Sequence, residues 1–196
     1  LFFTEMWERF SFYGLNAVLV LFLTKAMHIP ESLALIIFGS YVTYVYLSTT
    51  IAGFLADRLY GYAQVAFMGG IFILIGHITM ALSGLNFNLF YFGLGCIATG
   101  TGLLKPNVSV MVGKLYSDAH EDQRVQGFNI YYMGINIGAV IAPIAVGFVA
   151  EKVSWHAGFG LAAIGMAIGL LSLKHGEKAF PSNCKISNHN LINSRV

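Results

Sequence analysis

Charged residues are scarce in this chain of 196 residues: they make up 10% of it, whereas apolar residues make up 57%. A water-soluble domain carries roughly 25% charged residues, so too few are present here to form a water-facing shell. The net charge of +2 is too small to indicate a nucleic-acid partner. The composition also excludes a disordered chain and a collagen-like chain.

Cysteine is almost absent as well. Cys96 lies in an apolar run and Cys184 lies in a polar segment near the end of the chain, so the two residues indicate neither a disulfide framework nor a metal site. The chain begins with Leu1 rather than Met, and its first apolar run starts at once. We therefore expect a fragment of a longer protein, without a cleavable signal peptide.

Long apolar runs dominate the sequence. A helix needs about 20 apolar residues to cross a bilayer, and six runs of about that length are separated by short polar breaks. Glycine is frequent, with 22 residues, as is typical of helices that pack closely in a membrane. The runs are too long for strands and lack their period of two residues. The predicted spans are residues 1–24, 33–56, 63–83, 88–113, 125–150 and 155–173.

The sequence therefore predicts an all-α membrane protein, with a six-transmembrane-helix bundle over residues 1–178. Residues 179–196 are rich in polar side chains and are predicted to be an unstructured tail or linker. Lys and Arg of the connecting segments favour a cytoplasmic N-terminus, because more of them lie on that side. The cytoplasmic set would be Arg58, Lys114, Arg124, Lys174 and Lys178, and the outer set would be Lys25 and Lys152.

Four charged residues lie inside apolar runs: Glu5, Glu8, Arg9 and Lys105. A charge within a span costs at least a few kcal/mol and is usually functional. Glu5, Glu8 and Arg9 share one helix face. An Arg between two carboxylates stays charged, while either Glu can take up a proton, which is the chemistry of a proton relay. The alternative is a snorkelling cluster at the start of the first span.

The predicted depth of the charged residues within the membrane favours the proton relay. Arg9 lies about 24 Å from the outer end of the first span, and Lys105 lies about 25 Å from the outer end of the fourth, at 1.5 Å per residue. We expect the two to face one cavity, with Lys105 opposing Glu5 or Glu8, although Lys105 alone could be an interfacial lysine. Tyr46 and Asn136 are predicted at intermediate depth by the same arithmetic. A buried Asn suits an amide or zwitterionic ligand, or it joins two helices.

Four segments resemble the proton-dependent oligopeptide transporters of the major facilitator superfamily. Residues 5–14, Glu-Met-Trp-Glu-Arg-Phe-Ser-Phe-Tyr-Gly, resemble the ExxERFxYYG signature, with Phe12 in place of the first of the paired tyrosines. Residues 53–61 resemble the loop motif after the second span, residues 104–107 the fourth-span lysine, and residues 131–138 the fifth-span signature. The order and spacing match over about residues 1–178.

The resemblance implies half of a twelve-helix transporter, built as two inverted three-helix repeats, whose C-terminal half is a further expected partner. It implies proton-coupled symport of di- and tripeptides by alternating access across the inner (plasma) membrane, with no enzymatic activity, no metal and no organic cofactor. The implied proton-coupling residues are Glu5, Glu8, Arg9 and Lys105. The implied substrate-binding residues are Tyr13, Tyr46, Lys105 and Asn136. The implied gate residues are Asp57 and Arg58.

Three alternatives remain open. The solute could be another small molecule, such as an amino acid or nitrate. A proton-linked sugar or drug carrier of the wider superfamily would explain the loop motif but not the Glu-x-x-Glu-Arg segment together with Lys105. The third alternative is a non-transporting membrane protein or a non-functional transporter fragment.

Overall fold

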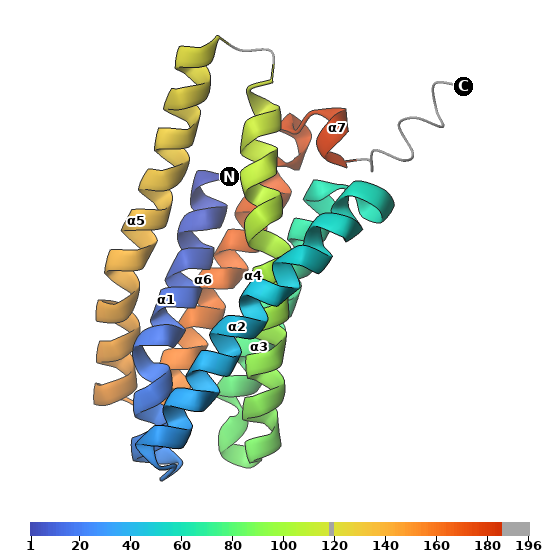
Figure 1. Ribbon diagram of the computed structural model, residues 1–196. Helices are drawn as coiled ribbons and strands as arrows, with labels where there is room; N and C mark the ends of the chain where they lie inside the picture. The colour runs from blue at the N-terminus through green and yellow to red at the C-terminus, as the bar shows by residue number, and fades with distance from the viewer. Residues whose placement is uncertain (118–119, 186–196) are drawn as a thin grey trace.

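The computed structural model describes residues 1–117 and 120–185, and six long helices run through this part of the chain (Figure 1). The helices are α1 (Phe2–Leu21), α2 (Glu31–Leu55), α3 (Tyr62–Ala81), α4 (Phe87–Leu115), α5 (Glu121–Lys152) and α6 (Trp155–Gly176). Each overlaps one predicted span. The all-helical six-helix bundle is confirmed.

Short helical turns extend the long helices. A π-helical turn, Phe22–Ala26, prolongs α1, and another, Ala56–Tyr60, prolongs α2. Gly61 has a φ of 86°, which an L side chain rarely adopts, and it ends the second turn before α3 begins. The 3₁₀ turns Ser83–Leu85 and Glu177–Ala179 lie before α4 and after α6.

Five of the helices in the described part are long and apolar enough to cross a membrane: α2, α3, α4, α5 and α6. α1 carries three charged residues and is not among the five, but it packs along α5 and α6 over its length. With its π-helical turn it is about 37 Å long, at 1.5 Å per residue, and this exceeds the roughly 30 Å of a bilayer core. The chain is a multi-pass membrane protein.

The helix contacts repeat between the two halves of the chain. α1 packs mainly on α5 and α6, and α4 packs mainly on α2 and α3. If α1, α2 and α3 are exchanged with α4, α5 and α6 in that order, the contacts of α1 become those of α4. α1 runs away from the end where the chain begins, while α4 runs towards it (Figure 1). This arrangement is that of two inverted three-helix repeats.

Glycine lets α3 and α4 approach closely. A Cβ atom built on Gly69 would lie 2.6 Å from the carbonyl oxygen of Gly100, and one built on Gly76 would lie 2.6 Å from that of Gly93. The two contacts are seven residues apart on each helix, so both lie on one line along the crossing. Small residues at such contacts stabilise membrane helices through close backbone packing.

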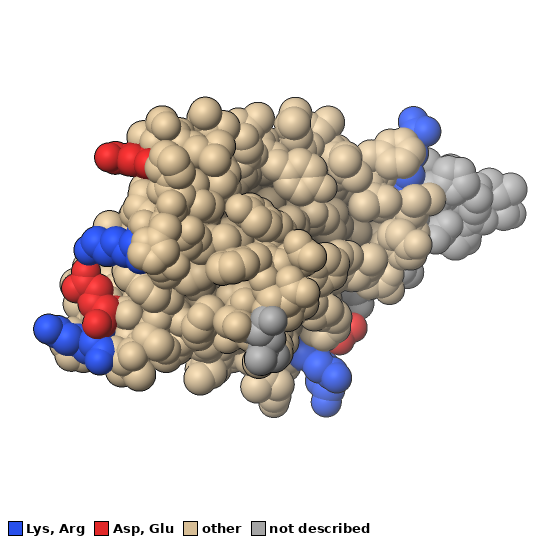
Figure 2. All heavy atoms as spheres, turned by 90° about the horizontal axis from the view of Figure 1, so that it is seen from below, with Lys and Arg blue, Asp and Glu red and all other residues tan. Residues whose placement is uncertain are grey.

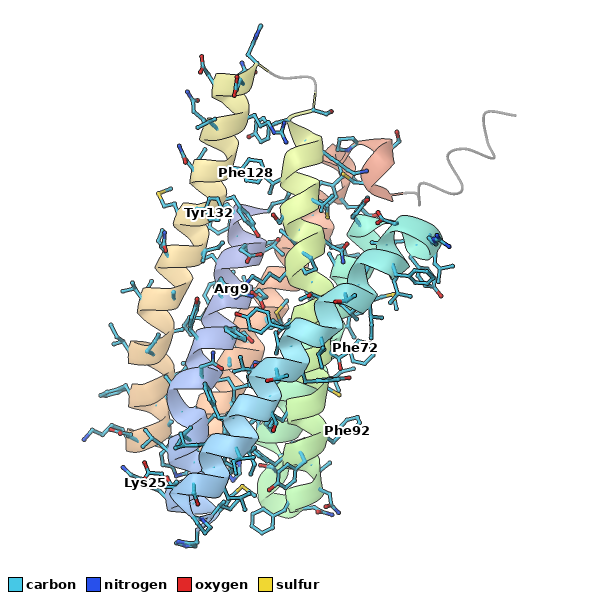
Figure 3. All side chains as sticks on the ribbon, viewed as in Figure 1. Arg9, Lys25, Phe72, Phe92, Phe128 and Tyr132 are labelled. Carbon is cyan, nitrogen blue, oxygen red and sulfur yellow. The ribbon has the colours of Figure 1, made fainter. Side chains whose placement is uncertain are left out.

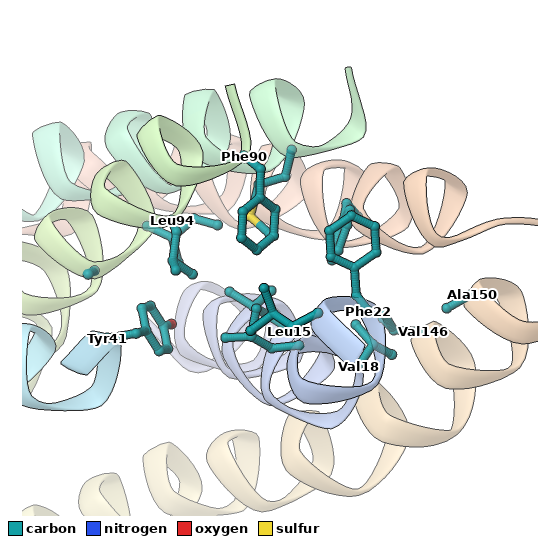
Figure 4. Close-up of a cluster of buried hydrophobic side chains, with 14 of the residues drawn as sticks. Leu15, Val18, Phe22, Tyr41, Phe90, Leu94, Val146 and Ala150 are labelled. Carbon is teal, nitrogen blue, oxygen red and sulfur yellow. The ribbon is translucent and has the colours of Figure 1, made fainter. Parts of the chain in front are cut away.

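An apolar core surrounds the second half of α1. Leu15 and Val18 of α1 and Phe22 of the π-helical turn that follows meet side chains of α2, α4 and α5 (Figure 4). Phe22 packs against Phe90, with ring centroids 5.1 Å apart. Seen from the end opposite to the N-terminus, the molecule is mostly uncharged, and the few Lys, Arg, Asp and Glu side chains lie near its edge (Figure 2).

The predicted unstructured tail is wrong for its first residues. After the turn Glu177–Ala179, a short helix, α7 (Ser182–Lys185), packs against α3 and α4. Phe180 and Cys184 are buried there, in an apolar cluster with Tyr62 and Val112. An aromatic ring and a thiol placed between polar residues anchor this segment. Residues 186–196 of the predicted tail lie outside the described residues.

Candidate functional site

The charged cluster of α1 is buried in the first half of the helix. Glu5 and Glu8 are fully buried, and Arg9 is 2% exposed. The Nε of Arg9 lies 3.3 Å from Oε1 of Glu5, and the guanidinium also donates to Glu8 in a close ion pair. It lies 4.9 Å from the ring centroid of Phe12. One cation therefore faces two carboxylates in a water-poor environment, and the cluster keeps a net negative charge unless one carboxyl group takes up a proton.

A pocket of about 420 Å³ opens beside this cluster, between α1, α2, α4 and α5. Four of the predicted site residues line it: Arg9, Tyr13, Tyr46 and Lys105. Figure 3 shows Arg9 midway along α1 and Tyr132 on α5, nearer the end where the chain begins. The other lining residues are Phe12, Val45, Thr49, Thr101, Pro106, Ser109, Tyr131, Tyr132 and Ile135.

Lys105 lines the same pocket as Arg9 but, within the described part of the chain, forms no salt bridge with the carboxylates. Its side chain is exposed to the pocket, on the turn of α4 that contains Pro106. Among the described residues, both Glu5 and Glu8 pair with Arg9, and neither pairs with Lys105. The structure thus brings the two cations to one cavity and leaves the ammonium of Lys105 available to another anion.

Asn136 lies outside the pocket lining. It is exposed on α5, one turn beyond Tyr132, which does line the pocket. Residues four apart share a helix face, so Asn136 continues the exposed face on which Tyr132 lies. Tyr46, by contrast, lines the pocket of Arg9 and Lys105 from α2, and its side chain is 66% exposed.

Two tyrosines of α5 were not assigned a role from the sequence. Tyr131 is 4% exposed, and its hydroxyl lies beside the carboxylate of Glu5. Tyr132 packs against Phe128 with ring centroids 6.4 Å apart. Phe128 lines a second cavity of about 520 Å³ between the ends of α4 and α5. One ring of this pair therefore lines the central pocket and the other lines the second cavity.

In the sequence, the two tyrosines stand about one turn before Asn136, within the residues 131–138 that resemble the fifth-span signature. This position is the one feature of the sequence that could have pointed to a role for them. The rotation of α5 about its axis decides which of two neighbouring tyrosines faces α1. The nearly uniform apolar sequence of this helix does not encode that rotation.

Asp57 and Arg58 lie at the turn between α2 and α3 and point to different neighbours. Asp57 accepts a hydrogen bond from the hydroxyl of Tyr62, and the ammonium of Lys114 lies 4.3 Å from the centroid of the Tyr62 ring. Asp57 is thereby connected through Tyr62 to the end of α4. The guanidinium of Arg58 lies 5.4 Å from the ring centroid of Phe54 and is exposed.

A buried polar pair joins α1 to α3. Ser11 and His77 are 1% and 0% exposed, and the Ser11 hydroxyl is hydrogen-bonded to Nε2 of His77. Thr4, Glu8 and Ser11 lie on one inward face of α1, so this pair stands one turn beyond Glu8. The pair holds the face of α1 that carries Glu8 against α3.

The sequence of a known family matches most of this chain. A model of the POT family, PTR2, matches residues 63–195. The chain belongs to the POT family. This is a family of transporters rather than of enzymes.

Two bacterial relatives illustrate how much of a full-length protein this chain covers. It is 47% identical to an uncharacterized transporter, YclF, of Bacillus subtilis (strain 168), over 87% of this chain and 35% of the relative. It is 44% identical to a di-/tripeptide transporter of Lactococcus lactis subsp. lactis (strain IL1403), over 92% of this chain and 38% of the relative. The chain thus spans somewhat more than a third of the length of these relatives.

Solved structures of the POT family superimpose on the bundle. A mutant of a peptide transporter POT in complex with sulfate is 42% identical, with a TM-score of 0.89, over 95% of this chain and 39% of that one. A POT family transporter in complex with 5-aminolevulinic acid is 35% identical, with a TM-score of 0.88, over 96% of this chain and 39% of that one. The six helices therefore have the arrangement of one part of these transporters.

Proposed function

We propose that this chain forms the N-terminal half of a proton-coupled symporter of di- and tripeptides. The observation that carries the proposal is the pocket that Arg9 and Lys105 line together, with Tyr13, Tyr46 and Tyr132 around it. Two cations and several hydroxyl groups suit a small peptide, which has a terminal carboxylate and polar backbone groups. The Lactococcus lactis relative is named a di-/tripeptide transporter, which supports this substrate class.

Proton coupling follows from the competition for Arg9. With both carboxylates charged, Arg9 is held by Glu5 and Glu8. A proton on one of them weakens that pairing and frees the guanidinium for the carboxylate of a peptide, which Lys105 also attracts across the pocket. Proton and peptide binding would then favour the same conformation, which is the thermodynamic requirement for symport.

The C-terminal half of the transporter would complete the pocket. Of the five apolar spans in the described part, α2 and α5 have the smallest fraction of buried residues. In their most apolar stretches, 22% and 28% of the residues are buried. Their exposed faces include the polar side chains of Thr43, Thr50, Asn129 and Asn136. Polar groups are unfavourable against lipid, so we assign these faces to contact with the second half and with the peptide between the halves.

The halves would rock about the central site, with Asp57 and Arg58 at the inner gate. We place the N-terminus in the cytoplasm and the protein in the inner (plasma) membrane, on the distribution of Lys and Arg described above. The connection from Asp57 through Tyr62 to the end of α4 supports a role of this corner in that movement.

Uptake by the complete gene product in proteoliposomes tests the proposal. We expect labelled dialanine to accumulate when the outside is acidic and to be displaced by unlabelled di- and tripeptides. Single amino acids should displace it poorly. A protein that accumulates no dialanine under the proton gradient would remove the peptide from the proposal.

A second candidate is transport of another small amino-acid-like solute. The complex of a related transporter with 5-aminolevulinic acid favours it, since that ligand also combines an amine with a carboxylate. Competition of 5-aminolevulinic acid with labelled dialanine separates the two candidates. Uptake of the acid without any uptake of dialanine would favour the second.

A further inference from the structure

A cavity of about 380 Å³ lies on the side of the bundle away from the pocket of Arg9 and Lys105. It is formed by the first two turns of α3, the last turn of α6 and the segment that follows α6. None of these elements lines the central pocket. Its lining residues are Ala63, Gln64, Phe67, Met68, Leu173, Lys174, Glu177 and Phe180.

The cavity combines apolar walls with one positive and one negative side chain. Phe67, Leu173 and Phe180 supply apolar surface, and the last two are buried. Lys174 and Glu177 are exposed, and in residues 1–117 and 120–185 neither forms a salt bridge with any partner. A ligand that fits these charges has an anionic and a cationic group close together and an apolar chain attached to them.

The surroundings of the cavity identify the source of such a ligand. Beyond Gln64 in its first turn, the large exposed side chains along α3 are apolar: Met68, Ile71, Phe72, Ile75 and Ile78. Phe72 points away from the bundle in Figure 3. Such a face is suited to lipid chains, and the cavity lies at the end of it, within about 9 Å of the start of α3, where lipid head groups meet water.

We propose that this cavity binds a phospholipid with a phosphoethanolamine head group. The phosphate would contact the ammonium of Lys174, and the primary ammonium of the head group would contact the carboxylate of Glu177. One acyl chain would lie along Phe67 and Met68. A phosphatidylglycerol head group offers no cation to Glu177, and the methylated ammonium of phosphatidylcholine has no N–H to donate.

The bound lipid would connect the first turns of α3 with the end of α6. Phe180 closes the cavity and packs in the same apolar cluster as Cys184 of α7. The lipid would therefore also stabilise the position of the segment that leaves the bundle. This inference depends on the membrane setting alone and does not rest on peptide transport.

Native mass spectrometry of the purified complete gene product tests the proposal. The protein is mixed with dioleoyl lipids of the three head groups in equal amounts, and the lipid that stays bound is counted. We expect phosphatidylethanolamine to be retained in preference to the other two. Equal retention of all three lipids, or stronger retention of phosphatidylglycerol, would overturn the proposal with the unmodified protein alone.

Variants locate the site. Lys174→Gln and Glu177→Gln are each expected to weaken retention of phosphatidylethanolamine about fivefold, as loss of one charge contact at a membrane surface predicts. Lys178→Gln is the matched control, because it removes the same charge four residues further on from a residue that does not line the cavity. Retention that falls equally in Lys178→Gln and Lys174→Gln would exclude this cavity as the site.

Discussion

The two sides of the bundle differ in how they use polar side chains. The side formed by α1, α2, α4 and α5 holds buried charges and a pocket lined by tyrosines and lysine. Where α3 crosses α4, glycines meet backbone to backbone, and beyond Gln64 the large exposed side chains of α3 are apolar. The first side keeps groups whose charge can change, at a cost in stability, whereas the second provides the close packing that offsets that cost.

Glu8→Gln is expected to have the largest effect on the pocket side. The Glu8 carboxylate is fully buried and paired with Arg9, and an amide cannot carry the transported proton. We expect uphill accumulation of dialanine to fall to background, while counterflow exchange of labelled for unlabelled peptide survives. The melting temperature in detergent should change little. A variant that still concentrates dialanine against its gradient would refute the proton role of Glu8.

Lys105→Ala should lower proton-driven uptake by at least about tenfold, because it removes a charged partner of the substrate whose contacts are worth roughly 1.5–3 kcal/mol. Lys152→Ala removes the same charge at the far end of α5 and should leave uptake unchanged. Initial rates under a proton gradient measure both. Uptake at the unmodified level by Lys105→Ala would show that the pocket works without its second cation.

Gly69→Leu tests the packing side. A Cβ at this position would meet the backbone of Gly100 and Leu104 at 2.6 and 2.7 Å, so α3 and α4 must separate. We expect a loss of stability of roughly 1–3 kcal/mol or more, seen as less folded protein in fluorescence-detected size exclusion. Gly95→Leu is the control, because nothing lies within 4 Å of that position. Equal yields of the two variants would contradict the close approach.

Ser11→Ala should also lower the stability of the bundle, without forcing two helices apart. It leaves Nε2 of His77 without its described partner, which costs about 1–3 kcal/mol for a buried group. Ser172→Ala removes a hydroxyl that donates within its own helix, to Ile168, and should be nearly neutral. Thermal unfolding compares the two. If both variants unfold at the same temperature, the pair does not join the two sides of the bundle.

The order of the helices and their approximate bounds could be predicted from the sequence because the apolar runs are long and the polar breaks short. The similar depth of Arg9 and Lys105, which line one pocket, also followed, since depth along a helix depends only on residue number. Contacts across helices depend in addition on how each helix is rotated. For this reason the pairing of the carboxylates with Arg9 alone and the role of Tyr131 did not follow.

Two further features had no clear signal in the sequence. Ser11 and His77 are 66 residues apart, and each looks like an ordinary packing residue when its own helix is considered alone. Residues 177–185 have a defined position because Phe180 and Cys184 are buried against α3 and α4. A polar composition predicts a solvated segment and cannot reveal such anchors.

Peptide-driven proton movement in proteoliposomes tests the central claim most directly. With a pH-sensitive dye inside the vesicles and no membrane potential, addition of dialanine outside should acidify the interior in the unmodified complete gene product. The same addition should leave the interior unchanged in Glu8→Gln. Dialanine that enters without any acidification in the unmodified protein would contradict the claim that a proton on the α1 carboxylates travels with the peptide.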